Sequence, residues 1–274
     1  MSETIDLQKK AMDTLLATSR TFFIPISILT PVLKEAVASA YLCMRAIDEI
    51  EDHPQLPAEA KIHLLRSMSQ ILQKPFDESE WRKIVEPYKE KLPEVSLLIG
   101  DWIKLAPSTV TPTIMNATAT MAQGMAKWVE KDWRIQTEAD LDDYTYYVAG
   151  LVGVLLSNLW VWYDGTDTDR ELAIGFGRGL QAVNILRNRE EDLARGGVDY
   201  FPNRWEMDDM FLYARRNLAL ADAYCEQIKP GPILNFCKIP LALAHGTLKA
   251  LESGATKLTR GEVMEIVGRV AETN

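Results

Sequence analysis

Cysteine and histidine are scarce in this sequence, and their scarcity excludes several kinds of site. The three cysteines, Cys43, Cys225 and Cys237, lie far apart and form no CxxC pair. An odd, scattered set does not suit a disulfide-stabilised domain or a zinc site, and it fits a reducing, cytoplasmic environment. None of the three histidines belongs to a Glu-x-x-His motif, so a di-iron helical bundle is also excluded.

Long apolar runs are absent as well. The first residues, MSETIDLQKKAMDTLL, mix charged and apolar side chains, whereas a secretory signal has an uninterrupted apolar core. The richest apolar segment, residues 148–162, is shorter than the ~18 residues of a membrane span, and Asp142, Asp143 and Asp164 flank it. We therefore expect a cytoplasmic protein without an integral membrane segment, in which residues 148–162 form a buried core helix.

Positive charge is in deficit. The 274 residues carry a net charge of −9, with 47% hydrophobic and 25% charged residues. An acidic surface repels nucleic acid, which we exclude as a partner, and it admits an anionic small molecule only where metal cations mediate the contact. The composition is that of an ordinary globular protein with a sizeable core, and it specifies no oligomeric state.

Helical periodicity runs through the whole sequence, and no segment alternates as a β-strand does. Pro25 and Pro31 bracket an expected linker, and Pro230-Gly-Pro232 is the strongest late breaker. We predict an all-α, single-domain helical bundle over residues 1–274, built around a central cavity. The expected helices span residues 4–17, 32–51, 58–74, 78–90, 94–104, 110–132, 138–163, 168–194, 207–227, 238–252 and 260–272.

The helix expected at residues 36–52 carries an acidic stripe. At about 100° per residue, Tyr41, Arg45, Asp48 and Asp52 share one face, and the remaining positions are mainly apolar. Carboxylates that face a packed interior are costly unless they are paired or bound to metal. Asp48 and Asp52 lie one turn apart and suit Mg²⁺. The ordinary alternative is a solvated acidic helix end.

A second polar stripe lies on the helix expected at residues 168–194. Gln181, Asn184, Asn188 and Asp192 share one face of it. Asparagine and glutamine are poor choices inside a helix unless their amides have a role. If the two stripes face each other across one cavity, Mg²⁺ ions can clamp a diphosphate leaving group there. Arginines on both helices supply further positive charge.

These residues resemble the squalene/phytoene synthase family of head-to-head trans-prenyl synthases, over residues 19 to about 251. Ser19-Arg-Thr-Phe22 resembles the family's diphosphate-contacting Ser-x-[Ser/Thr]-Phe segment. Tyr144-Thr-Tyr-Tyr-Val-Ala-Gly-Leu-Val-Gly153 resembles its tyrosine-rich signature, and Tyr200-Phe-Pro202 its Tyr-x-Pro end. The resemblance implies an isoprenoid-synthase-like fold, a prenyl diphosphate substrate and Mg²⁺ as cofactor.

The resemblance also implies roles for individual residues. Tyr144 is expected to steer a proton to the departing diphosphate, and its ordinary alternative is a core tyrosine. Mg²⁺ is expected at Asp48, Asp52, Asn184 and Asp192, and catalytic roles are expected for these four residues, Tyr144 and Asn188. Substrate contacts are expected from Ser19, Thr21, Phe22, Tyr41, Arg45, Gln181, Arg187 and Tyr200.

The sequence departs from the family pattern at two places. Asn188 stands where the family has the first aspartate of its second motif, and Val198 stands where an arginine is usual. A neutral amide offers one acceptor oxygen and no negative charge. We expect weaker metal binding to impair the joining of two prenyl groups more than a single ionisation.

The expected activity is therefore Mg²⁺-dependent hydrolysis of farnesyl diphosphate to farnesol and pyrophosphate. The chain also resembles the bacterial farnesyl diphosphate phosphatase offshoot of the family. Two alternatives remain open at this point. One is a head-to-head prenyl synthase of the squalene, dehydrosqualene or phytoene type, in which Asn188 ligates Mg²⁺ through its amide oxygen. The other is a non-catalytic prenyl-lipid binding protein.

Overall fold

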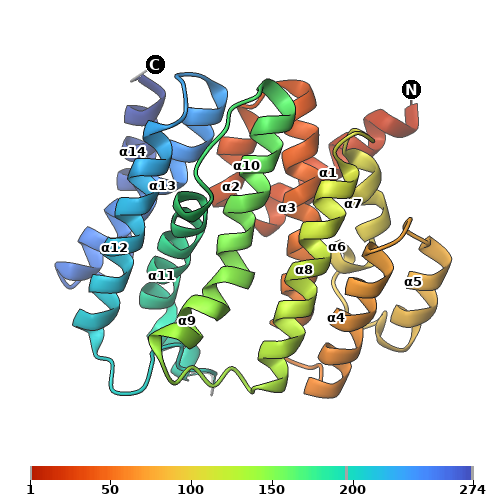
Figure 1. Ribbon diagram of the computed structural model, residues 1–274, viewed down its shortest axis with the longest axis horizontal. Coiled ribbons are helices and arrows are strands. Elements are labelled where there is room, and N and C mark those ends of the chain that lie inside the picture. The colour runs from red at the N-terminus through yellow and green to blue at the C-terminus, as the bar shows by residue number, and fades with distance from the viewer. Residues whose placement is uncertain (1, 195–196, 273–274) are drawn as a thin grey trace. The chain divides into compact units, whose positions relative to one another are not determined.

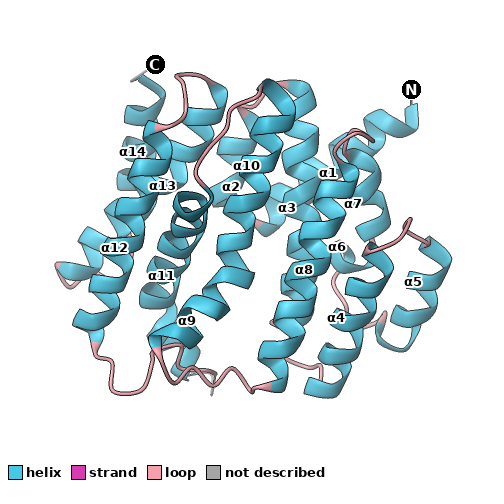
Figure 2. Cartoon of the chain, in the orientation of Figure 1, coloured by secondary structure: helices cyan, strands magenta, loops and turns pink. Residues whose placement is uncertain are grey.

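The computed structural model describes residues 2–194 and 197–272. Helices make up 77% of the structure, and the described part of the chain contains no strand (Figure 2). The all-α prediction is confirmed. The chain divides into two compact units, an N-terminal unit of Met1–Asp132 and a C-terminal unit of Trp133–Asn274. Each unit is described in turn, and the single-domain organisation stays a prediction.

The N-terminal unit is built around one buried helix, α3 (Figure 1). This helix packs against α1, α6, α7 and α8, and α4 packs against α8. Buried hydroxyls join the elements, because Ser39 donates to the Trp102 carbonyl at 2.7 Å and Ser96 donates to the Ala46 carbonyl at 2.8 Å. The helices are α1 (Ser2–Thr18), α2 (Arg20–Ser27), α3 (Pro31–Glu51), α4 (Ala58–Leu72), α5 (Glu78–Val85), α6 (Glu94–Leu97), α7 (Ile99–Leu105) and α8 (Thr111–Glu130), with a 3₁₀ turn at Glu86–Tyr88.

The C-terminal unit is built around α11, which packs against α10, α12 and α13. Helix α9 runs through a π-helical segment, η2, directly into α10, so that the three form one continuous helical stretch. The elements are α9 (Glu138–Thr145), η2 (Tyr146–Gly150), α10 (Leu151–Asp164), α11 (Arg170–Ala194), α12 (Met207–Glu226), α13 (Pro232–Glu252) and α14 (Arg260–Glu272).

Two expectations based on proline are wrong. The linker expected between Pro25 and Pro31 is shorter than predicted, because α2 continues to Ser27 with Pro25 inside it and only residues 28–30 connect it to α3. Ser19 caps the start of this helix by accepting a hydrogen bond from the Phe22 amide at 3.2 Å, which satisfies a free N–H of the first turn. Helix α13 begins at Pro232 and not at residue 238, because proline at the first helical position loses no hydrogen bond.

Among the described residues, one helical stretch is long and apolar enough by length and composition to cross a membrane, Glu138–Asp164. A core helix of a soluble protein passes the same test. Here 44% of the most apolar window is buried. Trp160 is fully buried, and its indole donates to the Tyr224 hydroxyl of α12 at 2.9 Å. These contacts support the interpretation of residues 148–162 as a core helix.

Candidate active site

Three carboxylates gather at the C-terminal end of α3. Oxygens of Asp48, Glu51 and Asp52 lie within 4.8 Å of one another, with Glu51 buried, Asp48 half-buried and Asp52 exposed. The last turn of α3 contains no basic residue, and the C-terminal end of a helix dipole is itself negative. Like charges at such a position favour a bound cation, and carboxylate oxygens suit Mg²⁺. The residues present therefore fit the expected metal.

Glu51 is the member of this cluster that sequence reasoning missed. Its position is off the stripe that contains Asp48 and Asp52, on the side of α3 that faces the core, and only 1% of its surface is exposed. Lys61 of α4 lies nearby and donates from Nζ to the Glu51 carbonyl oxygen at 2.5 Å. A charged residue at a buried helical position was the available signal, since such residues require a charged partner or a metal.

Arg45 joins the cluster from one turn earlier. Its guanidinium donates to the Asp48 and Glu49 carboxylates, each at 2.5 Å. Burial and the neighbouring Asp52 carboxylate nevertheless raise the pKa of Asp48 to about 7, against the lowering effect of Arg45. The Arg45 Nε is buried and has no hydrogen-bond partner among the described residues. Both observations suit a site that accommodates a cation and an anionic ligand together.

The Ser19–Phe22 segment and Tyr41 lie together in the same unit. The rings of Phe22 and Tyr41 are 5.7 Å apart between centroids. Burial raises the pKa of Tyr41, and a hydrogen bond with Ser19 opposes this effect. Thr21 is exposed at the first turn of α2. The Ser19–Phe22 segment thus packs against Tyr41, which lies on the same stripe of α3 as Arg45 and the carboxylates.

This stripe is more open than the sequence predicts. Tyr41, Arg45 and Asp48 are half-buried and Asp52 is exposed, whereas the stripe was expected to face a packed interior. The rest of α3 is buried almost throughout. The polar side chains therefore occupy the accessible face of a core helix, where a ligand from solution can reach them.

The second stripe lies on α11 of the C-terminal unit. The helix is continuous from Arg170 to Ala194, so Gln181, Asn184, Asn188 and Asp192 keep the spacing that places them on one face. Asn184 is exposed and the other three are half-buried. The stripe and its apolar surroundings follow the prediction, and the expectation that it faces the first stripe stays a prediction.

Asn188 makes a contact that its sequence position does not reveal. The exposed Arg187 donates from Nε to the Asn188 side-chain oxygen at 3.1 Å. The single acceptor oxygen of this amide is thus directed at a neighbouring cation, in keeping with its lower capacity as a metal ligand.

Tyr144 and Tyr200 meet in the C-terminal unit. Their rings stack with centroids 4.9 Å apart and an interplanar angle of 20°, and Tyr144 is buried with 4% exposure. The segment that carries Tyr200 is anchored next to it, because Arg189 donates to both oxygens of Asp199, at 2.8 and 3.2 Å. The Arg189 guanidinium also lies 3.8 Å from the centroid of the Phe201 ring.

Small residues allow η2 and α10 to approach α11 closely. A Cβ atom at Gly153 would overlap the backbone of Ala173 in α11, and one at Gly177 would overlap the backbone of Ala149 in η2. Neither Gly153 nor Gly177 has room for a side chain at this contact. The close approach sets the position of the helical stretch that carries Tyr144.

Comparisons with known proteins agree with this arrangement. The sequence model described as squalene/phytoene synthase matches residues 15–208. Squalene synthase of Homo sapiens is 28% identical over 91% of this chain and 66% of the human protein. Squalene synthase of Dictyostelium discoideum is 27% identical over 92% of this chain and 68% of that protein. The chain thus spans about two thirds of the length of these curated relatives.

Solved structures show the same fold. A ligand complex of TcSQS superposes with a TM-score of 0.81 at 24% identity, covering 97% of this chain and 86% of the other. A dehydrosqualene synthase in complex with a ligand superposes with a TM-score of 0.66 at 17% identity, covering 99% and 98%. The expected isoprenoid-synthase-like fold is confirmed.

The expectation of farnesyl diphosphate hydrolysis is wrong in the light of these comparisons. The relatives named above are squalene synthases, and the structures named above are squalene and dehydrosqualene synthases, which favours the head-to-head synthase alternative. The expectation gave too much weight to the departures at Asn188 and Val198. An amide oxygen still ligates divalent cations, and the carboxylates of α3 and Asp192 remain.

The matched segment contains both polar stripes, the Ser19–Phe22 segment and the Tyr144–Tyr200 stack. It covers well over half of the chain. The chain therefore belongs to the squalene/phytoene synthase family.

Proposed function

We propose that this protein is a Mg²⁺-dependent head-to-head prenyl synthase that joins two prenyl diphosphates of the farnesyl class. The observation that carries the proposal is the carboxylate cluster of Asp48, Glu51 and Asp52. It lies within the segment matched by the family, in a chain whose curated relatives are squalene synthases. An acidic cluster is suited to an anionic substrate only when cations bind between them.

The residues of α3 form the binding part of the proposed site. Asp48, Asp52 and the buried Glu51 hold Mg²⁺, which when bound neutralises the charge of the departing diphosphate. Arg45 contributes a guanidinium to the diphosphate oxygens, since its buried Nε has no hydrogen-bond partner among the described residues. The polar face of α11, with Asn184 and Asp192, provides a second set of oxygen ligands suited to Mg²⁺.

Tyr144 handles the proton in this proposal. Joining two prenyl diphosphates into a cyclopropyl diphosphate forms the new carbon–carbon bonds and releases one diphosphate and one proton. A buried phenol next to Tyr200 can relay that proton to the departing diphosphate. When the second diphosphate leaves, the remaining cation either loses a proton or accepts hydride from a reduced nicotinamide, and each route gives a hydrocarbon.

A product assay tests this function. The protein is incubated with Mg²⁺ and farnesyl diphosphate, with and without a reduced nicotinamide, and the lipids are identified by mass spectrometry. We expect a cyclopropyl diphosphate or a C30 hydrocarbon, and only unchanged substrate after chelation of the metal. Farnesol as the sole lipid product, or no turnover at all, contradicts the proposal.

Matched variants link the product to the carboxylate cluster. Asp48→Ala is expected to reduce turnover to background because it removes a half-buried metal ligand. Asp101→Ala is the control, since Asp101 lies on α7 of the same unit and pairs only at the surface, 3.6 Å from Lys104. Equal activity of the two variants would place the chemistry elsewhere.

A further inference from the structure

The helical stretch that carries Tyr144 changes its hydrogen-bond register immediately after that residue. Tyr146–Gly150 is π-helical, and the Leu151 amide donates back to the Tyr146 carbonyl five residues earlier. A π-helical segment inserts one residue into an α-helix, and it persists only where its surroundings hold it. The contacts at its start therefore determine how α9 is rotated about its axis.

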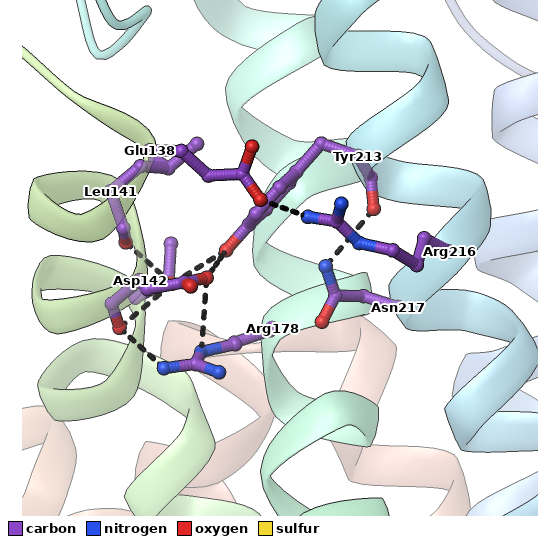
Figure 3. A network of polar contacts seen from close by, with 8 residues as sticks. Glu138, Leu141, Asp142, Arg178, Tyr213, Arg216 and Asn217 are labelled. Carbon is purple, nitrogen blue, oxygen red and sulfur yellow. Dashed lines mark hydrogen bonds and ion pairs between the residues drawn. The ribbon is translucent and has the colours of Figure 1, made fainter.

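Asp142 lies in the turn of α9 that precedes the π-helical segment, and it is held through both its backbone and its side chain (Figure 3). Arg178 of α11 donates from Nη2 to the Asp142 carbonyl oxygen at 2.8 Å, and its Nε lies 3.7 Å from the Asp142 carboxylate. Tyr213 of α12 donates its hydroxyl to the same carboxylate at 2.8 Å. Two neighbouring helices thus fix one residue of α9 at two points, which restricts rotation of the helix.

Further contacts join α9 to α12 (Figure 3). The Thr145 hydroxyl is buried 3.2 Å from the Tyr213 hydroxyl, and it also donates to the Leu141 carbonyl at 2.6 Å. Arg216 pairs with Glu138 in the first turn of α9. The Arg216 guanidinium also covers the Tyr213 ring at 5.4 Å from its centroid. Tyr213 is consequently held in one orientation, with 1% of its surface exposed.

This geometry is more specific than stability requires. A polar, charged set of this kind contributes little more to stability than apolar residues of the same volume, and often less. These contacts fix the orientation of α9, because the Arg178 guanidinium contacts both the carbonyl and the carboxylate of Asp142. Tyr144 lies two residues after Asp142, and its ring stacks on Tyr200. The rotation of α9 therefore sets where the Tyr144 hydroxyl is directed.

We propose that Asp142, Arg178 and Tyr213 are positioning residues, which hold α9 in the rotation that directs the Tyr144 hydroxyl to the reacting group. The proposal rests on the proposed function for its consequences in catalysis. None of the three residues needs to touch substrate. Their effect on the reaction passes through Tyr144, and this distinguishes them from residues that only stabilise the unit.

Tyr213→Phe and Asp142→Asn test the proposal in the wild-type chain and in a Tyr144→Phe chain. In the wild-type chain we expect kcat to fall about 10- to 100-fold, since small displacements of a catalytic group have effects of this size. KM is expected to change less than about twofold, because substrate binding is not affected. In the Tyr144→Phe chain neither substitution is expected to lower kcat further.

Tyr224→Phe is the matched control. Tyr224 also lies on α12, is buried to a similar extent, and bonds to Ser157 and Trp160 of α10 at 2.9 Å each. Its loss is expected to lower thermal stability as Tyr213→Phe does, while kcat stays at the wild-type value. Effects of Tyr213→Phe that add to those of Tyr144→Phe, or an equal loss of kcat in Tyr224→Phe, overturn the proposal.

Amide hydrogen exchange gives a readout that does not depend on turnover. We expect Tyr213→Phe to accelerate exchange selectively in peptides that cover residues 146–151, and Tyr224→Phe to leave these peptides unchanged. Unaltered exchange in Tyr213→Phe contradicts the positioning role even if the protein is an active synthase. If the wild-type protein forms no coupled product, the proposed function fails, and the exchange result still decides whether the contacts hold α9.

Discussion

Gly177 is the position where one added methyl group is most informative. Its Cβ would overlap the Ala149 carbonyl oxygen and lie 2.8 Å from the Gly150 amide nitrogen. Both neighbours are backbone atoms of the π-helical segment η2, so no side chain can rotate away. Gly177→Ala therefore forces α11 and η2 apart.

The expected magnitude follows from two opposing contributions. Alanine is favoured over glycine inside a helix by about 1 kcal/mol. Overpacking against rigid backbone typically costs about 1–3 kcal/mol and sometimes more. Real Cβ atoms essentially never approach another atom closer than 3.0 Å, and the three nearest atoms at Gly177 are all closer, so the cost falls at the upper end. We expect a net loss of about 1–2 kcal/mol in the free energy of unfolding.

Thermal and denaturant unfolding measure this loss, with Gly268→Ala as the control. Gly268 lies within α14, and a Cβ there meets no atom within 4 Å. The control should gain about 0.4–1 kcal/mol through the lower entropy of the unfolded chain. Gly177→Ala should also lower kcat, because η2 follows Tyr144 directly. A Gly177→Ala protein as stable as the Gly268→Ala protein would refute the packing argument.

Three further outcomes are expected. Burial and Asp52 raise the pKa of Asp48 to about 7, so the metal-free protein should lose stability as pH rises from about 4 to 7. Asp48→Asn should then raise the melting temperature of the metal-free protein at pH 8 and abolish the further rise on adding Mg²⁺. A melting temperature of the metal-free variant below that of the wild type would contradict this expectation. Asn188→Asp should tighten Mg²⁺ binding measured by calorimetry without changing the lipid product, whereas a new product class would show that Asn188 selects the reaction. Arg189→Ala should lower kcat and accelerate proteolysis near Tyr200, because Asp199 loses both hydrogen bonds from the guanidinium and keeps the one from the Phe201 amide; wild-type kcat would exclude a role for this pair.

Most helices were predictable because their signals are local. The 3.6-residue period and the proline positions located α3, α4, α8 and α11 to within a few residues of their observed bounds. Helix α2 was missed because Pro25 was interpreted as a breaker, whereas the Ser19 cap and the apolar residues around it support a short helix. The proline argued against a helix there and the cap argued for one, and the packing of the apolar side chains favoured the helix.

The candidate site was predictable where spacing determines geometry. On a helix, side chains three or four residues apart necessarily share a face, and this places Asp48 with Asp52 and Asn184 with Asn188. The same rule places Glu51, three residues after Asp48, beside it, but only the structure shows that the Glu51 carboxylate is buried and close to both Asp48 and Asp52. Spacing also does not reveal that Asn188 accepts a hydrogen bond from Arg187.

The sequence by itself determined the helical class, the two polar stripes and the family, since each depends on residue type and short-range spacing. Tertiary structure alone decided the rotation of α9 and the π-helical register after Tyr144. That rotation depends on Arg178 and Tyr213, which lie 36 and 71 residues from Asp142 in the chain. A helix repeats the same backbone at every turn, so its own sequence leaves rotation about its axis open, and contacts from distant elements determine it.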